Sequence, residues 1–127
     1  MIDHVSVGVR DLDRAARFYE QALAPLGLSR LVTRPATIGF GKSYPEFWVN
    51  LRAGLLPIDA DSGAHAALRV RTSELVDAFH AAALATGGRC DGAPGLRSQH
   101  GEGYYAAFVR DPDGNRVEAV TFLKPQE

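Results

Sequence analysis

Two histidines and a glutamate could together bind a divalent metal ion. His4 and His65 each open a segment in which apolar and polar residues alternate, and Glu118 lies in the last such segment. Imidazole nitrogens and a carboxylate suit divalent ions such as Zn, Ni, Mn or Fe, and three protein ligands leave open positions for water or substrate. Because the three residues are far apart in the sequence, such a site requires a fold that brings them together.

The chain contains an internal repeat. The offset that relates the two histidines also relates further pairs of identical residues, among them Arg10 and Arg71, Phe18 and Phe79, and Gly27 and Gly88. These positions fall in a strand, in a helix and at the end of that helix. The repeat therefore predicts two structurally similar modules with the histidines at equivalent places.

Each module is expected to begin with a strand and a helix. Alternation over residues 4–9 is typical of a strand with one buried face. Asp11 can cap a helix that Pro25 and Gly27 end. The second helix is expected to begin at Thr72 or Ser73 and to stop at residues 87–88.

Strand-like segments follow each helix: 28–33, 37–41 and 47–52 in the first half, and 104–110 and 115–122 in the second. Residues 111–114 (DPDG) predict a turn, and residues 91–103 predict a loop around at most one short strand. We therefore expect one α+β domain over residues 1–127, with βαβββ modules at 1–55 and 63–124. Their strands should form a cupped mixed sheet with the helices outside.

The metal-binding candidates should lie on the concave face of this sheet. The apolar side of each strand must face its helix, so His4 and His65 are expected on the opposite side. Aligning the last strands of the two halves by their sequence places Asn50 over Glu118. The pattern thus predicts His4, His65 and Glu118 as metal ligands, with Asn50 as a possible fourth.

Other polar and aromatic residues are candidates for substrate binding. Trp48 and Arg52 flank Asn50 on the same predicted face, and Arg69 follows the second histidine on its strand. A guanidinium in a cavity wall can hold a carboxylate or phosphate through two hydrogen bonds. Tyrosines at the expected cavity mouth are further candidates: Tyr44, Tyr104 and Tyr105. The alternative interpretation is that these are surface arginines and strand residues chosen for packing.

Composition points to an ordinary globular protein that binds small molecules. The 127 residues carry a formal net charge of −1 and are 46% hydrophobic, which favours neither nucleic acid nor an anionic membrane as a partner. The single cysteine cannot form an internal disulfide, and no signal-like or membrane-spanning apolar run is present, so a cytoplasmic location is expected. Sheet edges in a chain this small predict a homodimer.

Three segments resemble the vicinal-oxygen-chelate (glyoxalase-like) superfamily: residues 2–7 (IDHVSV), 63–66 (GAHA) and 110–118 (RDPDGNRVE). The resemblance extends from residue 1 to about residue 123. It implies paired βαβββ modules around a divalent metal that chelates neighbouring oxygens of a substrate. By position, the ligands of the family match His4, His65 and Glu118.

The resemblance leaves the reaction open. Asn50 stands where glyoxalase I has a second glutamate, and an amide cannot accept the proton that this glutamate transfers, so a true glyoxalase I is not expected. Glu118, and His100 in the predicted loop, are the catalytic candidates. Three hypotheses compete: a metal-dependent isomerase, lyase or thiol transferase; an iron-dependent extradiol-type dioxygenase; and a non-catalytic drug- or metabolite-binding protein similar to bleomycin-resistance proteins.

Overall fold

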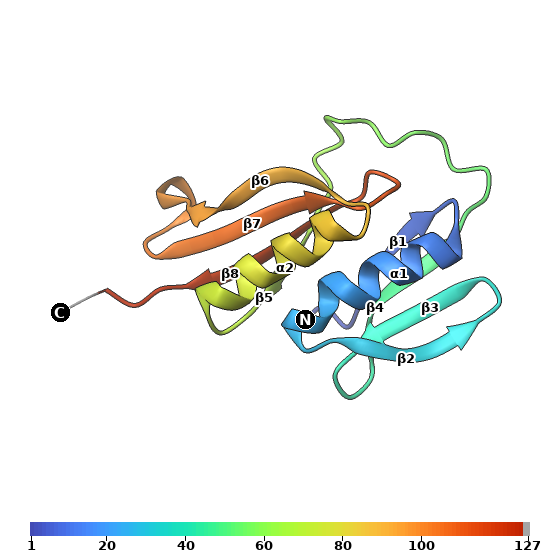
Figure 1. The fold of residues 1–127 in the computed structure, drawn as a ribbon, viewed down its shortest axis with the longest axis horizontal. Helices are drawn as coiled ribbons and strands as arrows, with labels where there is room; N and C mark the ends of the chain where they lie inside the picture. Colours follow the sequence, from blue (N-terminus) through green and yellow to red (C-terminus); the bar gives the residue numbers. More distant parts are fainter. Residues whose placement is uncertain (126–127) are drawn as a thin grey trace.

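The computed structural model describes residues 1–125 and contains two modules with the same order of elements (Figure 1). The first comprises β1 (Val5–Val9), α1 (Leu12–Leu23), the 3-10 turn η1 (Ala24–Leu26), β2 (Ser29–Arg34), β3 (Thr37–Gly41) and β4 (Pro45–Leu51). The second comprises β5 (Ala66–Arg69), α2 (Ser73–Ala85), β6 (Arg89–Leu96), the 3-10 turn η2 (Ser98–His100), β7 (Tyr104–Arg110) and β8 (Arg116–Phe122).

The predicted α+β class is confirmed, and each module has its own mixed sheet. The strand orders are β1-β4-β3-β2 and β5-β8-β7-β6, so the two sheets have four strands each and the same topology. In each sheet the first and last strands of the module pair in parallel, and the remaining neighbours pair antiparallel. The strands therefore form two sheets, and the described residues show no ladder that joins them into one.

One strand is longer than the sequence predicted. β6 occupies residues 89–96, where the sequence favoured a loop with at most one short strand. Its pairing with β7 shifts register around Gly92 and again before Gly95. Glycine and proline within this segment remove the alternating side-chain pattern by which a strand is recognised, and such irregularities are typical of an edge strand.

Capping residues position both helices as expected. The Asp11 side chain accepts a hydrogen bond from the backbone N–H of Arg14, at 3.0 Å, and Thr72 caps α2 in the same way. Gly27 ends η1 with a φ of 80°, a left-handed conformation that glycine adopts without steric cost. α2 ends at Ala85, slightly before the predicted stop. Neither helix is long and apolar enough to cross a membrane within residues 1–125.

A single apolar core joins the modules. α1 and α2 lie side by side and pack against each other (Figure 1). Aromatic side chains from both modules fill the core, and Tyr19 contacts Phe18 edge to face at a centroid distance of 4.8 Å and Phe47 at 5.0 Å. Each fully buried side chain of this kind stabilises the fold by about 1.5–3 kcal/mol.

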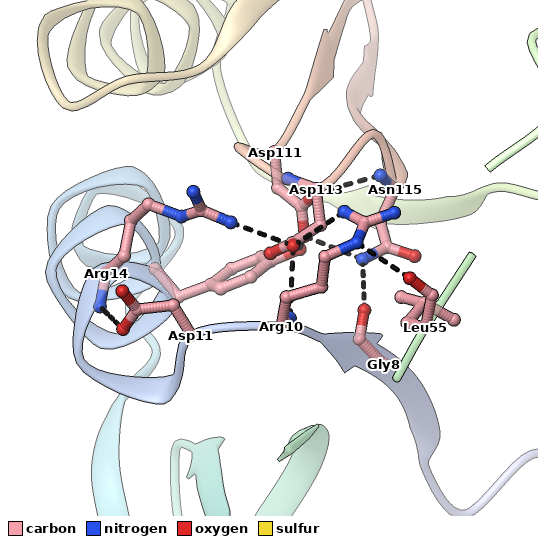
Figure 2. Close-up of polar contacts among 9 residues, drawn as sticks. Gly8, Arg10, Asp11, Arg14, Leu55, Asp111, Asp113 and Asn115 are labelled. Carbon is pink, nitrogen blue, oxygen red and sulfur yellow. Dashed lines mark hydrogen bonds and ion pairs between the residues drawn. The ribbon is translucent and has the colours of Figure 1, made fainter. Parts of the chain in front are cut away.

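A carboxylate on the turn between β7 and β8 links the second module to the start of α1. Oδ1 of Asp113 lies 3.0 Å from Nη1 of Arg10 and 2.9 Å from Nη2 of Arg14, and it also accepts the backbone N–H of Arg10 (Figure 2). The Asp113 side chain is fully buried, whereas the two arginines are partly exposed. The ion pairs therefore join the first module to the second, between residues that are 103 and 99 positions apart in the sequence.

Asp111, on the same turn, forms a second set of contacts between modules. It accepts the hydroxyl of Tyr19 at 2.6 Å and the side-chain amide of Asn115 at 2.8 Å, and Asn115 also donates to the carbonyl of Gly8 at 2.8 Å (Figure 2). Gly114 completes the turn with a φ of 99°. Burial raises the pKa of Asp111, and burial together with the Asp111 charge raises the pKa of Tyr19 well above its usual value. The DPDGN segment is thus a connection between modules.

Removing the Asp113 carboxylate should destabilise the whole chain. In Asp113→Ala, two arginines lose a buried partner, and we expect the free energy of unfolding to fall by about 2–4 kcal/mol in chemical denaturation. Asp91 is the matched control, because it also lies between two arginines, Arg110 and Arg116, but is partly exposed. Asp91→Ala should lower the free energy of unfolding by at most about 1 kcal/mol. Equal losses in the two variants would contradict the special role of Asp113.

Candidate functional site

A buried glutamate forms the centre of the candidate site. Glu118 lies on β8, where it pairs with Ala67 of β5 on one side and Phe108 of β7 on the other. Its residue is 2% exposed, and Nε2 of His65 lies 3.0 Å from its Oε1. The other carboxylate oxygen accepts a hydrogen bond from the hydroxyl of Tyr104. The structure therefore brings together two of the three predicted ligands and adds a tyrosine.

Tyr104 holds its proton firmly. Burial raises the pKa of this phenol to about 12, and its hydrogen bond to Glu118 acts in the same direction. At neutral pH the hydroxyl is therefore a donor, which satisfies one oxygen of a buried carboxylate that would otherwise lack a partner. The sequence analysis placed Tyr104 at the cavity mouth but did not predict its hydrogen bond to Glu118. The turn at 111–114 offered the signal, because it fixes the β7–β8 register and so places Tyr104 and Glu118 on one face.

The rings of His100 and Phe108 lie beside the site. The imidazole of His100, in η2, lies 5.3 Å from the ring of Tyr104, and the ring of Phe108 lies 6.4 Å from that of His65. His100 is exposed, and the His65 side chain is 45% exposed, so both are accessible from solvent. The predicted catalytic candidate His100 therefore adjoins Tyr104, the hydrogen-bond partner of the buried carboxylate.

His4 lies on the same side of the molecule but outside this cluster. Its Nδ1 is 2.7 Å from Oδ1 of Asp3, and its side chain is half exposed. His4, His65 and Glu46 line one hollow of about 340 Å³. Among residues 1–125, no three histidine, cysteine, aspartate or glutamate side chains are arranged to hold a metal ion. Metal binding by His4, His65 and Glu118 stays a prediction.

The strand register corrects the alignment that matched Asn50 with Glu118. β5 pairs Ala67 with Glu118, whereas β1 pairs Ser6, the counterpart of Ala67 in the repeat, with Trp48. Trp48 therefore occupies the position equivalent to Glu118. A shift of two residues keeps every side chain on its face of the strand, so the alternating pattern could not reveal the error.

The corresponding face of the first module is aromatic and amide-lined. The guanidinium of Arg34 lies 5.6 Å from the Trp48 ring centre, and Oδ1 of Asn50 accepts the hydroxyl of Thr37. These four side chains line a hollow, and His4 lines it as well. The Asn50 amide oxygen has a second lone pair, so Asn50 as a possible fourth metal ligand stays a prediction.

The other predicted substrate-binding residues lie elsewhere. Arg52 follows β4 and donates to the carbonyl of Leu51, and Arg69 stacks on the ring of Phe122 at 4.5 Å. The hydroxyl of Tyr105 donates to Asp77 of α2 at 2.7 Å, which places it on the helix side of the sheet. The structure therefore brings none of the three into contact with Glu118. Arg69 lies on the same face of β5 as His65 but at the far end of the strand, and Trp48 lines a hollow together with His4 and Asn50.

Comparison with known proteins gives the family context of this arrangement. A sequence model of the Glyoxalase/Bleomycin resistance protein/Dioxygenase superfamily matches residues 1–119. The chain is 33% identical to a glyoxalase/bleomycin resistance protein of Albidiferax ferrireducens T118, with a TM-score of 0.78 and coverage of 92% of this chain and 94% of the other. No curated protein matches the sequence.

Two more distant structures share the fold. A glyoxalase/bleomycin resistance protein/dioxygenase family enzyme of Burkholderia phytofirmans PsJN is 21% identical, with a TM-score of 0.73 and coverage of 96% of this chain and 98% of the other. Glyoxalase I of Zea mays is 22% identical, with a TM-score of 0.71 and coverage of 93% of this chain and 44% of the maize chain. At these identities the likeness concerns the fold alone.

The burial of Tyr104 and its hydrogen bond to Glu118 predict that this phenol loses its proton at an unusually high pH. The difference in tyrosinate absorbance between wild type and Tyr104→Phe should rise near pH 12, because that is where the folded protein loses this proton. Between about pH 10 and 12 the unfolded chain loses the proton first, so this group should lower stability as the pH rises through that window. A difference that rises near pH 10 would contradict the placement of the hydroxyl.

Proposed function

Because the chain belongs to the Glyoxalase/Bleomycin resistance protein/Dioxygenase superfamily, we propose that it is a metal-dependent enzyme acting on a small oxygenated substrate. The observation that carries this proposal is the buried Glu118 carboxylate, bonded to His65 and Tyr104 on the open face of a sheet. An isomerase, lyase or thiol-transferase reaction fits these residues best. His4 is proposed as the third ligand, since it lines a hollow with His65.

The chemistry of these side chains fits a divalent ion such as Zn, Ni, Mn or Fe. An imidazole nitrogen and a carboxylate oxygen already lie 3.0 Å apart, and the carboxylate is removed from water. A buried carboxylate with a cation beside it is more stable than one without. Tyr104 keeps the carboxylate oriented through its other oxygen, as partners of metal ligands commonly do.

The bound ion would polarise neighbouring oxygens of a substrate, and the residues of the chain would handle protons around it. Tyr104 is a donor at neutral pH, and His100, which lies against it, can exchange protons with solvent. Trp48, at the place equivalent to Glu118, supplies no carboxylate. We therefore propose a reaction other than that of glyoxalase I, which needs a second glutamate as base.

Metal binding tests the proposal. After chelation and reloading with Zn, Ni or Mn, elemental analysis should find about one ion per chain, because the cluster offers one site. His65→Ala and Glu118→Gln should weaken binding at least as strongly as the loss of an outer partner, which is about 10–100-fold. His4→Ala should also weaken it. His80→Ala is the control, because His80 lies on α2 beside Cys90. Metal content that is the same in all variants would refute the site.

A non-catalytic binding protein is the second candidate, and Trp48 favours it. A half-buried indole that lines a hollow, with a guanidinium beside it, can hold an aromatic or drug-like ligand without metal. Because Trp48 is the only tryptophan, its fluorescence reports such binding directly. In a thermal-shift screen on metal-free protein, a ligand that raises the melting temperature of wild type and Glu118→Gln but not of Trp48→Leu would support this function. Ligands that bind only metal-loaded protein would contradict it.

A further inference from the structure

A cleft between the modules carries positive charge that the candidate metal site does not use. It has a volume of about 520 Å³ and lies where η1, the loop after β3, the end of β5 and β8 meet. Cavities of this size are typical of sites for small molecules. Three cationic side chains line it, Lys42 from the first module and Arg69 and Arg71 from the second. No aspartate or glutamate belongs to its lining within residues 1–125.

Within residues 1–125, none of these three cations forms an ion pair with a carboxylate, because all the ion pairs there engage other cations. Glu46 lines an adjoining hollow of about 170 Å³, and its side chain accepts the backbone N–H of Lys42 at 3.3 Å. Unpaired cations around one concave space attract anions and raise their local concentration.

The cations come from three segments: Arg69 ends β5, Arg71 lies in the link to α2, and Lys42 lies in the loop after β3. Arg69 is held against the ring of Phe122, 4.5 Å from its centre, which limits the freedom of its guanidinium. Arg71 directly precedes Thr72, the cap of the 13-residue helix α2, whose positive dipole end adds to the local potential. Lys42 faces them from the other module across the cleft. An anion that contacts all three would therefore bridge the modules.

From this arrangement we propose that the cleft binds a phosphate or diphosphate group of a small molecule. A carboxylate is planar and one guanidinium satisfies it, whereas a phosphate offers oxygens in several directions and carries more than one negative charge. The net charge of −1 and the limited volume favour a small phosphorylated compound over a nucleic acid.

The cleft is separate from the His65–Glu118 pair but connected to it by one strand. β5 begins directly after His65 and ends at Arg69, and at about 3.3 Å per residue the two side chains are attached about 13 Å apart. Both residues lie on the same face of the strand, since their separation is even. Phosphate binding in the cleft does not require the metal site, so each can be tested without the other.

Calorimetric titration of chelator-treated, metal-free protein with inorganic pyrophosphate at constant ionic strength tests the proposal. We expect saturable binding of one pyrophosphate per chain, weakened about tenfold by Arg71→Gln or Lys42→Gln, as expected for the loss of one charged hydrogen bond. Arg17→Gln is the matched control, since Arg17 is exposed on α1 and away from the cleft. Glu118→Gln should bind pyrophosphate normally, which separates this result from the metal proposal.

Three results would overturn the inference. Titration without saturation would show that the cleft holds no anion. An equal loss of pyrophosphate affinity in Arg17→Gln and Arg71→Gln would show that the anion is attracted by the overall charge of the protein and not by a site. Binding of citrate as tight as that of pyrophosphate, and equally sensitive to Arg71→Gln, would show a carboxylate site and contradict the phosphate chemistry. Because all the substituted cations are exposed, each variant should keep its fold. Thermal denaturation of each variant checks this.

Discussion

The ion pairs of Asp113 with Arg10 and Arg14 set the relation between the two modules. A fully buried carboxylate is costly unless it is paired, and here its partners come from the start of α1 while it sits on the turn that leads into β8. The same turn fixes the register of β7 against β8 and thereby the meeting of Tyr104 with Glu118. Stability and the candidate chemistry therefore depend on one short segment.

Much of the architecture could be predicted from the sequence, because the repeat and the apolar periodicity report local order. Both helices, the cap of the first at Asp11, and the βαβββ order of each module followed from these patterns. The length of β6 was underestimated because its glycines and proline interrupt the alternation of apolar and polar side chains by which a strand is recognised. The Asn50 alignment was wrong because a shift of two residues preserves the face of every side chain, and only the hydrogen-bonded ladder distinguishes the registers.

The two modules have diverged at equivalent positions. The second has a carboxylate, Glu118, on its last strand, and the first has at the same position an indole, Trp48, beside the guanidinium of Arg34. Contacts with Glu118 were predictable for His65, which the repeat singled out, and less so for Tyr104, which required the hairpin register. This asymmetry suits a site in which the second module supplies two of the proposed ligands, His65 and Glu118, and the first module adds His4 and contacts to the organic part of a substrate.

The location of a bound metal ion is the most direct test of the central claim, that Glu118 and His65 form a divalent metal site. Crystals grown with Zn²⁺ and measured at its absorption edge should show an anomalous peak about 2.0–2.2 Å from Nε2 of His65 and from a carboxylate oxygen of Glu118. His4 should approach the same peak. A map without a peak there, with His65 still hydrogen-bonded to Glu118 as in the metal-free chain, would contradict the account.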